Sequence, residues 1–355
     1  MTTNFPIMAD VTRVDTVLFG PVVPVDEYLI PWLPELWFGI LLFTLGMYVF
    51  LDGFDFGIGM LYGTREDEAE RDLLLSIFGP VWDANEVWLV AFGTVLFAAF
   101  PPVYASLLSD HYLLVFAIVF ALILRGITPE LREQRDEPEW VRACDRGFVV
   151  GSTLSPFFIG TLAGSWVFGT GTIALPSVLT GVAVVFLSVA SGAAYVAMKT
   201  TDTLREEMVR YGLYAAAGYL LSVVVLLITV FLTDPLGVRE TLLSTPVLAV
   251  VLVTVVFLGI GVVAATRDAL EVTWWFYATG GVAFALITLV AILLYPDLYP
   301  ATGTTVRESI ISPLALNVLT VVVIPVLFLV LAYFRYLYTV FSGPVEHEDG
   351  YGTSD

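Results

Sequence analysis

Residues 241–266 read TLLSTPVLAVVLVTVVFLGIGVVAAT and contain no acidic or basic side chain. The stretch is long enough to cross a bilayer as a helix, which takes about 20 apolar residues. Similar runs recur along the chain, which is 58% hydrophobic and 14% charged, with a mean hydropathy of +0.88. Soluble domains carry about 25% charged residues. The sequence therefore predicts an all-α, polytopic integral protein of the cell membrane.

Nine membrane-spanning helices account for the charge-free runs. The run 147–198 is too long for one span, and the glycines and proline of GTGTIALPS (169–177) divide it into two helices. The predicted spans are 36–62, 82–107, 112–129, 146–168, 175–198, 211–233, 243–265, 272–295 and 311–338. They form a membrane domain over 36–340, between a polar extracytoplasmic lead-in (1–35) and an acidic cytoplasmic tail (341–355).

The basic residues are distributed unevenly between the two sides of this bundle. Arg13, Arg239 and Arg307 fall on one side, and the remainder of the 15 Lys and Arg residues fall on the other. This distribution counts Arg125 with the connection after the third helix. Because cytoplasmic loops carry the excess of Lys and Arg, we expect the N-terminus outside and the C-terminus in the cytoplasm.

The composition also indicates the kind of source organism and limits the disulfides and haem ligands that the chain can form. A net charge of −19 with a single lysine, Lys199, predicts a halophilic, archaeal source. The single cysteine, Cys144, excludes an intrachain disulfide. The two histidines, His111 and His347, fall on opposite sides of the predicted membrane, so they cannot together ligate a buried haem. We therefore expect no metal and no cofactor on this chain itself, and no nucleic-acid partner.

Carboxylates interrupt the apolar runs at two places near the predicted cytoplasmic surface. FLDGFDFGIGM (50–60) carries two aspartates three residues apart, and GPVWDANEVWL (79–89) repeats this spacing with an aspartate and a glutamate. Residues three apart lie on nearly the same face of a helix. With the end of the third helix, RGITPELR, the cytoplasmic half of the first three helices gathers Asp52, Asp55, Asp83, Glu86, Glu130 and Arg125.

Two interpretations of these acids stay open at this point. A charge in hydrocarbon costs several kcal/mol, so such groups usually face a bundle interior and move ions or protons. The structural alternative is that Asp52 and Asp83 pair with Arg125 or cap helix ends. The neighbouring Trp82, Asn85 and Trp88 are expected to support the same site.

Glycines mark a packing face on the first predicted helix. Gly53 and Gly57 form a G-x-x-x-G pattern, which lets a second helix backbone approach closely. Asp52 and Asp55 flank Gly53, so we expect the packed face to share at least one carboxylate.

Several stretches, in order, resemble subunit II of cytochrome bd-type quinol oxidases. They are LDGFDFGIGM, GPVWDANEVWL with FAAFPPVYA, RGITPELR, and YPDLYPATGTT followed by LNVLTVVVIPVLF, between about residues 36 and 340. The resemblance implies a haem-free, nine-helix subunit that forms a heterodimer with subunit I. That partner would hold two b-type haems, a third haem of d or b type where oxygen is reduced, and the quinol site. Some family members also bind a structural quinone in subunit II.

The resemblance assigns this subunit structural support and a cytoplasmic proton-uptake path. The acidic positions of the family correspond to Asp83 and Glu130. Two residues depart from the pattern: Ala84 replaces a glycine, and Pro129 precedes Glu130, where it is expected to bend or end the helix.

The expected function is therefore part of an electrogenic quinol:oxygen oxidoreductase. Oxygen is reduced to water with electrons from quinol. Asp83 would collect protons, and Glu86 with Asp52 and Asp55 would pass them inward. Two alternatives remain: a proton-coupled secondary transporter, which the lack of an internal two-fold repeat disfavours, and a haem-free scaffold whose acids are only structural.

Overall fold

The computed structural model describes residues 24–267 and 269–341. Most of the predicted lead-in (1–35) and of the predicted tail (341–355) lies outside the described residues, as does His347. The division into a lead-in, a membrane domain and a tail therefore stays a prediction.

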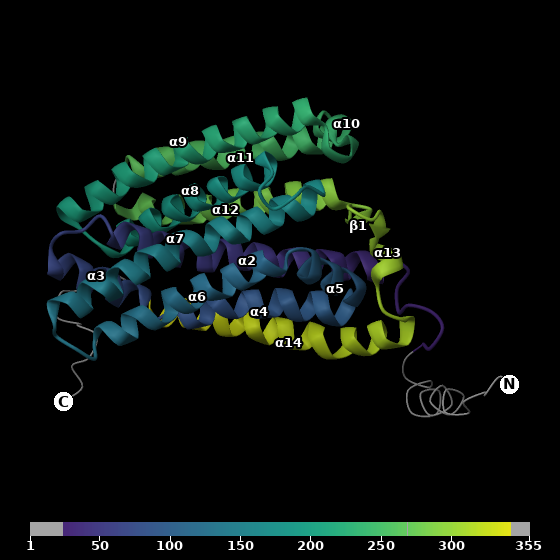
Figure 1. The fold of residues 1–355 in the computed structure, drawn as a ribbon, viewed down its shortest axis with the longest axis horizontal. Coiled ribbons are helices and arrows are strands. Elements are labelled where there is room, and N and C mark those ends of the chain that lie inside the picture. The colour runs from purple at the N-terminus through teal and green to yellow at the C-terminus, as the bar shows by residue number, and fades with distance from the viewer. Residues whose placement is uncertain (1–23, 268, 342–355) are drawn as a thin grey trace.

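Figure 1 shows a bundle of long helices that run side by side. The longer helices are α2 (Leu33–Tyr62), α3 (Glu68–Phe78), α4 (Trp82–Ala99), α5 (Pro101–Asp110), α6 (Tyr112–Arg132), α7 (Pro138–Phe168), α8 (Leu175–Lys199), α9 (Asp202–Thr233), α11 (Thr245–Ala265), α12 (Ala269–Leu294) and α14 (Pro313–Val340). The short elements are η1 (Pro235–Gly237), α10 (Arg239–Leu242), β1 (Asp297–Tyr299), β2 (Thr304–Thr305) and α13 (Val306–Ser309). The strands pair antiparallel, with Asp297 opposite Thr305.

The helices confirm the predicted all-α, polytopic membrane fold. Among the described residues, eight helices are long and apolar enough to cross a membrane. A ninth crossing is obtained if α3 and α4, which meet at an angle of 47°, form one bent span. This architecture follows from the bilayer, where every backbone N–H and C=O must be satisfied within its own segment.

The predicted second span, 82–107, is wrong in its boundaries. The structure ends α4 at Ala99 and begins α5 at Pro101, with Phe100 in a non-helical conformation (φ −129°, ψ 55°). A residue that precedes proline is driven out of the helical region by the proline ring. Pro101 therefore breaks the helix, and the apolar run continues as a separate short helix.

Two expectations for the third span are also corrected. Pro129 does not end the helix, because α6 continues to Arg132. The ion pairs of Arg132 with Glu68 and Asp145 hold this last turn against α3 and α7, which offsets the backbone hydrogen bond that proline lacks. Arg125 belongs to no connection: it lies inside α6 and is fully buried.

Helix α2 lies at the centre of the bundle. In its most apolar window 67% of the residues are buried, against 11% in α14. A Cβ atom on Gly57 would stand 2.0 Å from the carbonyl oxygen of Ser188 and 2.8 Å from the Cα of Gly192, so only glycine allows α2 and α8 to approach this closely. The predicted close-packing face is therefore confirmed at Gly57. Because α2 is central, Asp52 and Asp55 lie in the interior.

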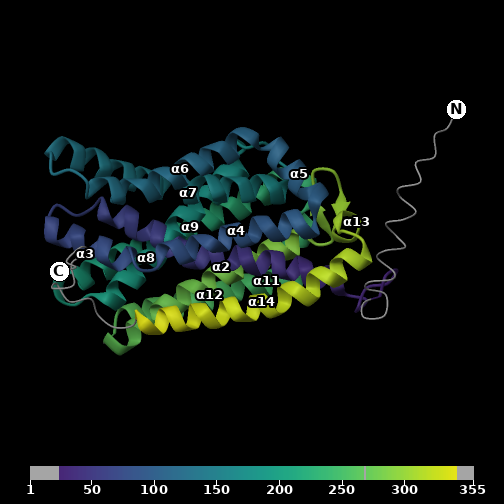
Figure 2. The ribbon, with the colours of Figure 1, turned by 90° about the horizontal axis from the view of Figure 1, so that it is seen from below.

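The two ends of the bundle differ. At one end lie α3 and the α2–α3, α6–α7 and α8–α9 connections, which we call the basic end; at the other lie β1, β2 and α13, which we call the hairpin end (Figure 1). Helix α2 begins at the hairpin end, and α14 finishes at the basic end. Figure 2 looks on the face formed by α6, α4 and α14, with α4 between the other two; α9 and α11 lie on the opposite side.

Candidate functional site

Arg125 is the centre of a buried group of charges. Its Nη1 donates to Asp52 Oδ1 at 2.6 Å, and both side chains are 0% exposed. Its Nη2 lies 3.7 Å from Glu86 Oε2. The pairing that the structural alternative expected for Asp52 is therefore present. Three helices, α2, α4 and α6, contribute to this group.

Aromatic rings surround the guanidinium of Arg125. The rings of Phe56, Phe78 and Trp82 lie 4.6, 5.8 and 5.7 Å from its central carbon. Phe78 and Trp82 also stack on each other at 5.5 Å. A desolvated cation–π contact contributes about 2 kcal/mol, so the rings help to hold a cation in a place from which water is excluded.

Asp55 belongs to a hydrogen-bonded chain beside this ion pair. Its Oδ2 accepts from Asn85 Nδ2 at 2.8 Å, and Asn85 Oδ1 accepts from the Tyr338 hydroxyl at 2.8 Å. Asp55 and Asn85 are 0% exposed. These hydrogen bonds connect α2, α4 and α14. The last described helix therefore contributes to a site whose acidic residues come from α2 and α4.

Several buried polar atoms at this cluster have no hydrogen-bond partner among the described residues. They include Asp55 Oδ1, Trp88 Nε1, Arg125 Nε and Arg125 Nη2. A buried polar atom without a partner costs about 1–3 kcal/mol, and proteins commonly satisfy such atoms with internal water. Asp55 Oδ1 is therefore available to water or to a transferred proton. We call Asp52, Asp55, Asn85, Glu86, Arg125 and Tyr338 the buried cluster.

The other two predicted acids lie outside the buried cluster. Asp83 is exposed in the first turn of α4, and Glu130 is exposed in the last turn of α6. Neither makes a hydrogen bond or ion pair within the described part of the chain. Helix α4 has Val81 as its N-cap and no side-chain capping bond, so Asp83 is not a cap. Glu130 lines a cavity of about 20 Å³ together with Trp82.

The supporting aromatic residues divide between the surface and the core. Trp82 is half-buried against Arg125, and its ring packs closely on Gly126, where a Cβ would stand 3.2 Å from the ring. Trp88 is 1% exposed and packs against Phe43 and Phe334. Trp88 therefore connects α4 to α2 and α14.

A second polar network was not predicted from the sequence. Asp145 accepts from the Tyr62 hydroxyl at 2.5 Å, from Arg132 Nε at 3.1 Å and from Arg71 Nη1 at 3.3 Å. The network joins α2, α3, α6 and α7 at the basic end. The sequence indicates this network only through one acid, Asp145, among the basic residues of VRACDR (141–146). Ordinary loops have a similar composition, so the pattern does not single out Asp145. The contacts of Asp145 hold α3 against the rest of the bundle.

His111 is the histidine within the described residues. Both ring nitrogens of His111 are engaged, Nδ1 with the carbonyl oxygen of Leu107 at 3.0 Å and Nε2 with Ser165 Oγ at 2.8 Å. Among residues 24–267 and 269–341, no group of three or more His, Cys, Asp and Glu side chains is arranged to hold a metal ion. Ligation of a haem iron by His111 would require one of these two hydrogen bonds to break.

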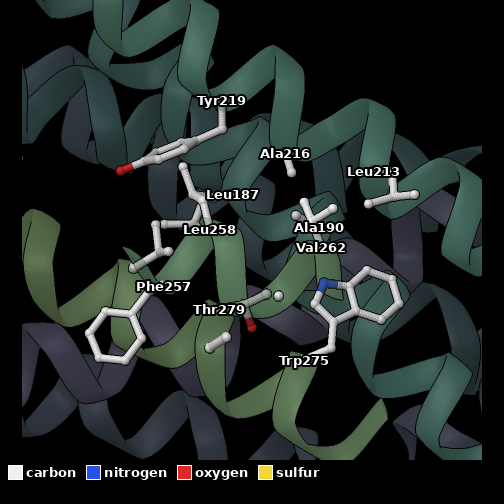
Figure 3. Close-up of a pocket in the computed structure, with 13 residues that line it drawn as sticks. Leu187, Ala190, Leu213, Ala216, Tyr219, Phe257, Leu258, Val262, Trp275 and Thr279 are labelled. Atoms are coloured by element: carbon white, nitrogen blue, oxygen red, sulfur yellow. The ribbon is translucent and has the colours of Figure 1, made fainter. Parts of the chain in front are cut away.

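One small internal cavity lies among four helices of the bundle. Figure 3 shows this cavity between α8, α9, α11 and α12, lined mainly by apolar side chains such as Leu187, Phe257 and Trp275. Its volume is about 20 Å³. Ligand pockets measure about 300–1,000 Å³, so this cavity has room for no more than a water molecule or a methyl group.

The fold and the buried cluster together define a polytopic α-helical membrane protein with ionisable groups held inside its bundle. The family described as "Cytochrome bd terminal oxidase subunit II" matches residues 33–341. The chain belongs to this family, as its sequence resemblance predicted, and is therefore one subunit of a terminal oxidase complex in the cell membrane.

Relatives and a solved structure agree with this assignment. "Cytochrome bd ubiquinol oxidase subunit 2" of Bacillus subtilis is 29% identical over 89% of this chain and 98% of the relative. "Cytochrome bd-I ubiquinol oxidase subunit 2" of Escherichia coli is 28% identical over 84% of this chain and 91% of the relative. The fold is similar to a chain of the bd oxidase from Geobacillus thermodenitrificans, with a TM-score of 0.70, 18% identity, and coverage of 87% of this chain and 98% of that one.

Proposed function

We propose that this chain is the haem-free subunit of a quinol:oxygen oxidoreductase and delivers protons from the cytoplasm to the site of oxygen reduction. The observation that carries the proposal is the buried cluster, in which Arg125, Asp52 and Asp55 are all 0% exposed. The relatives are named as ubiquinol oxidase subunits, which supports quinol as the electron donor. Reduction of oxygen to water consumes protons, so such a complex needs a path that supplies them.

The haems belong to the partner subunit in this proposal. Subunit I forms a heterodimer with this chain and holds two b-type haems and a third of d or b type, which supply the electron transfer and the oxygen chemistry. The residues of this chain hold and move protons only. The occupied ring nitrogens of His111 support this division.

The proton path runs from the basic end into the buried cluster. Asp83, exposed on the first turn of α4, collects protons at the surface. Glu86 lies one turn further along α4 and reaches Arg125 at 3.7 Å. Asp55 offers a free oxygen, Oδ1, in the interior. Asp52 is paired with Arg125 at 2.6 Å, so Asp52 serves mainly as the counter-ion of Arg125 and Asp55 as the proton carrier.

The basic end faces the cytoplasm in this proposal. Arg65, Arg71 and Arg132 lie there, whereas the described basic residues at the hairpin end are Arg239 and Arg307. Cytoplasmic loops carry the excess of basic residues. Protons would then be taken up on the side opposite to quinol oxidation, which makes turnover electrogenic.

The partner subunit covers the face formed by α6, α4 and α14. Glu86 keeps 32% of its side chain exposed on α4, inside the bent span. An ionisable group at membrane depth costs about 2.5–3.5 kcal/mol against lipid, so a protein surface is the better neighbour. Val90 and Phe97 lie on the same stripe of α4 and are 65% and 60% exposed. Helix α4 itself lies between α6 and α14 (Figure 2).

A tryptophan on this stripe is expected to disturb the complex. Val90→Trp should lower the amount of subunit I that co-purifies by about tenfold, because overpacking of a closely fitted contact costs about 1–3 kcal/mol. Leu252→Trp is the matched control, since Leu252 is 64% exposed on α11, on the opposite side of the bundle. Equal retention of subunit I by both variants would place the interface elsewhere.

The isolated chain is expected to bind no haem. After expression without subunit I its visible spectrum should lack a Soret band, and the band should appear when subunit I is co-expressed. The physical reason is that the described chain offers only His111, whose ring nitrogens are both engaged. A stoichiometric haem in the purified isolated chain contradicts the proposal.

A further inference from the structure

We propose that Tyr338 is a positioning residue for proton transfer: by fixing the amide of Asn85, it holds Asp55 so that Oδ1 is the oxygen that carries the proton. The inference rests on the proposed proton path and adds to it a residue from the last helix. Tyr338 lies on α14, far in sequence from the acidic motifs of α2 and α4.

Three contacts fix the orientation of the Asn85 amide. Its Nδ2 donates to Asp55 Oδ2 at 2.8 Å and lies 3.4 Å from the carbonyl oxygen of Leu51. Both of these groups accept hydrogen bonds when Asp55 is ionised, so the NH₂ group must face them. Asn85 Oδ1 then faces Tyr338, whose hydroxyl donates to it at 2.8 Å. Without that donor, the amide oxygen would be buried with no partner.

The fixed amide decides which oxygen of Asp55 can take a proton. Oδ2 is occupied by the N–H of Asn85, whereas Oδ1 has no partner among the described residues. A proton on Oδ1 leaves the bond to Oδ2 intact, so Asp55 can load and release a proton without rearrangement of Asn85. Tyr338 itself exchanges no proton in this scheme, because its hydroxyl keeps its hydrogen and donates it in a hydrogen bond to Asn85 Oδ1.

Other titratable and charged groups surround Asp55 and act on it electrostatically. They are Asp52 on α2, Glu86 on α4, Arg125 on α6, Tyr195 on α8 and Tyr338 on α14. A substitution at Tyr338 changes none of the carboxylates or the arginine. Its effect on the protonation of Asp55 therefore reports the hydrogen-bonded chain through Asn85.

The test is the pH profile of quinol-driven oxygen consumption by the whole complex with Tyr338→Phe. Phenylalanine keeps the ring and removes the donor, so the amide of Asn85 loses its fixed orientation and the ionised form of Asp55 loses stabilisation. The alkaline limb of the profile should move to higher pH by about 0.5–1 unit, the equivalent of one hydrogen bond of about 0.5–1.5 kcal/mol. Tyr336→Phe is the matched control, because Tyr336 is 68% exposed on the same helix.

The outcomes separate this inference from the proposed function. A shifted profile in Tyr338→Phe and an unshifted one in Tyr336→Phe support it. An unshifted profile in Tyr338→Phe overturns the role of Tyr338, whether activity is normal or uniformly reduced. If Asp55→Asn is inactive at the same time, the proposed proton path still stands. A fully active Asp55→Asn complex overturns the path itself. If Tyr338→Phe fails to assemble, Asn85→Leu decides by the same criterion, since leucine has a similar volume and makes no hydrogen bond to Asp55.

Discussion

Replacement of Asp55 by asparagine is expected to lower quinol-driven oxygen consumption by about a hundredfold or more, the scale of losing a proton-transfer group. Asparagine has the shape of aspartate and can still bond to Asn85, so the complex should assemble with its full haem content. An amide cannot be reversibly protonated near neutral pH. The measurement is oxygen uptake by purified complexes, normalised to haem.

Two further variants provide comparisons for the loss of activity in Asp55→Asn. Asp83→Asn should lower turnover less, by about tenfold, because Asp83 is exposed and other surface acids such as Glu130 can also collect protons. Asp234→Asn makes the same chemical change at the hairpin end, where asparagine suits the left-handed conformation (φ 47°), and should leave turnover unchanged. Normal turnover in an assembled Asp55→Asn complex would show that the aspartate is only structural.

The second large effect is expected on stability, from Arg125→Met. Removal of the cation leaves Asp52 as an uncompensated charge at 0% exposure. Breaking a buried ion pair in this way costs about 3–5 kcal/mol. The unfolding midpoint of the complex should therefore fall by roughly 5–15 °C, and less of the complex should be recovered after solubilisation.

A second substitution distinguishes charge imbalance from lost packing. Arg125→Met combined with Asp52→Asn removes both charges, and the double variant should recover most of the lost stability. Arg307→Met, at the exposed pair with Glu35, is the control and should leave the midpoint nearly unchanged. If the double variant is as unstable as the single one, the contacts of Arg125 with Phe56, Phe78 and Trp82 determine stability instead of its charge.

The sequence predicts the membrane fold well because the bilayer leaves few solutions. Charge-free runs of sufficient length can only be helices there, so each predicted span from 146–168 to 311–338 overlaps one long helix and extends past it by at most two residues. Whether a proline ends a helix is harder to predict from the sequence. Pro101 ends a helix, whereas Pro129 lies within one, and the difference depends on the ion pairs of Arg132 with other helices.

The candidate site is only partly visible in the sequence. The three-residue spacing of Asp52 with Asp55 indicates a shared helix face, and α2 does bury both. Nothing in the sequence around Tyr338 marks it, since α14 reads as one more apolar helix with tyrosines at its end. Its bond to Asn85 arises from the packing of α14 beside α4. Arg125 lies within the predicted span 112–129, but its pairing with Asp52 and Glu86 depends on how α2 and α4 pack against α6.

The composition carries one prediction that stays open. The low lysine content and the net charge of −19 predict a halophilic source, and the activity of the complex in concentrated salt tests it. Screening at high salt weakens exposed ion pairs but affects buried ones much less. The Arg125–Asp52 pair should therefore be retained under such conditions.

The most direct test of proton delivery through this chain is the side and rate of proton uptake after an oxygen pulse to reconstituted complexes. A cysteine at Gln134, which is exposed at the basic end, labelled by a membrane-impermeant reagent in a Cys144→Ser background, identifies the side that this end faces. We expect uptake on that side, and in Asp55→Asn a slowing of uptake as large as the slowing of oxygen consumption. Uptake from the side of the hairpin end, or an unchanged uptake rate in Asp55→Asn, would contradict the account.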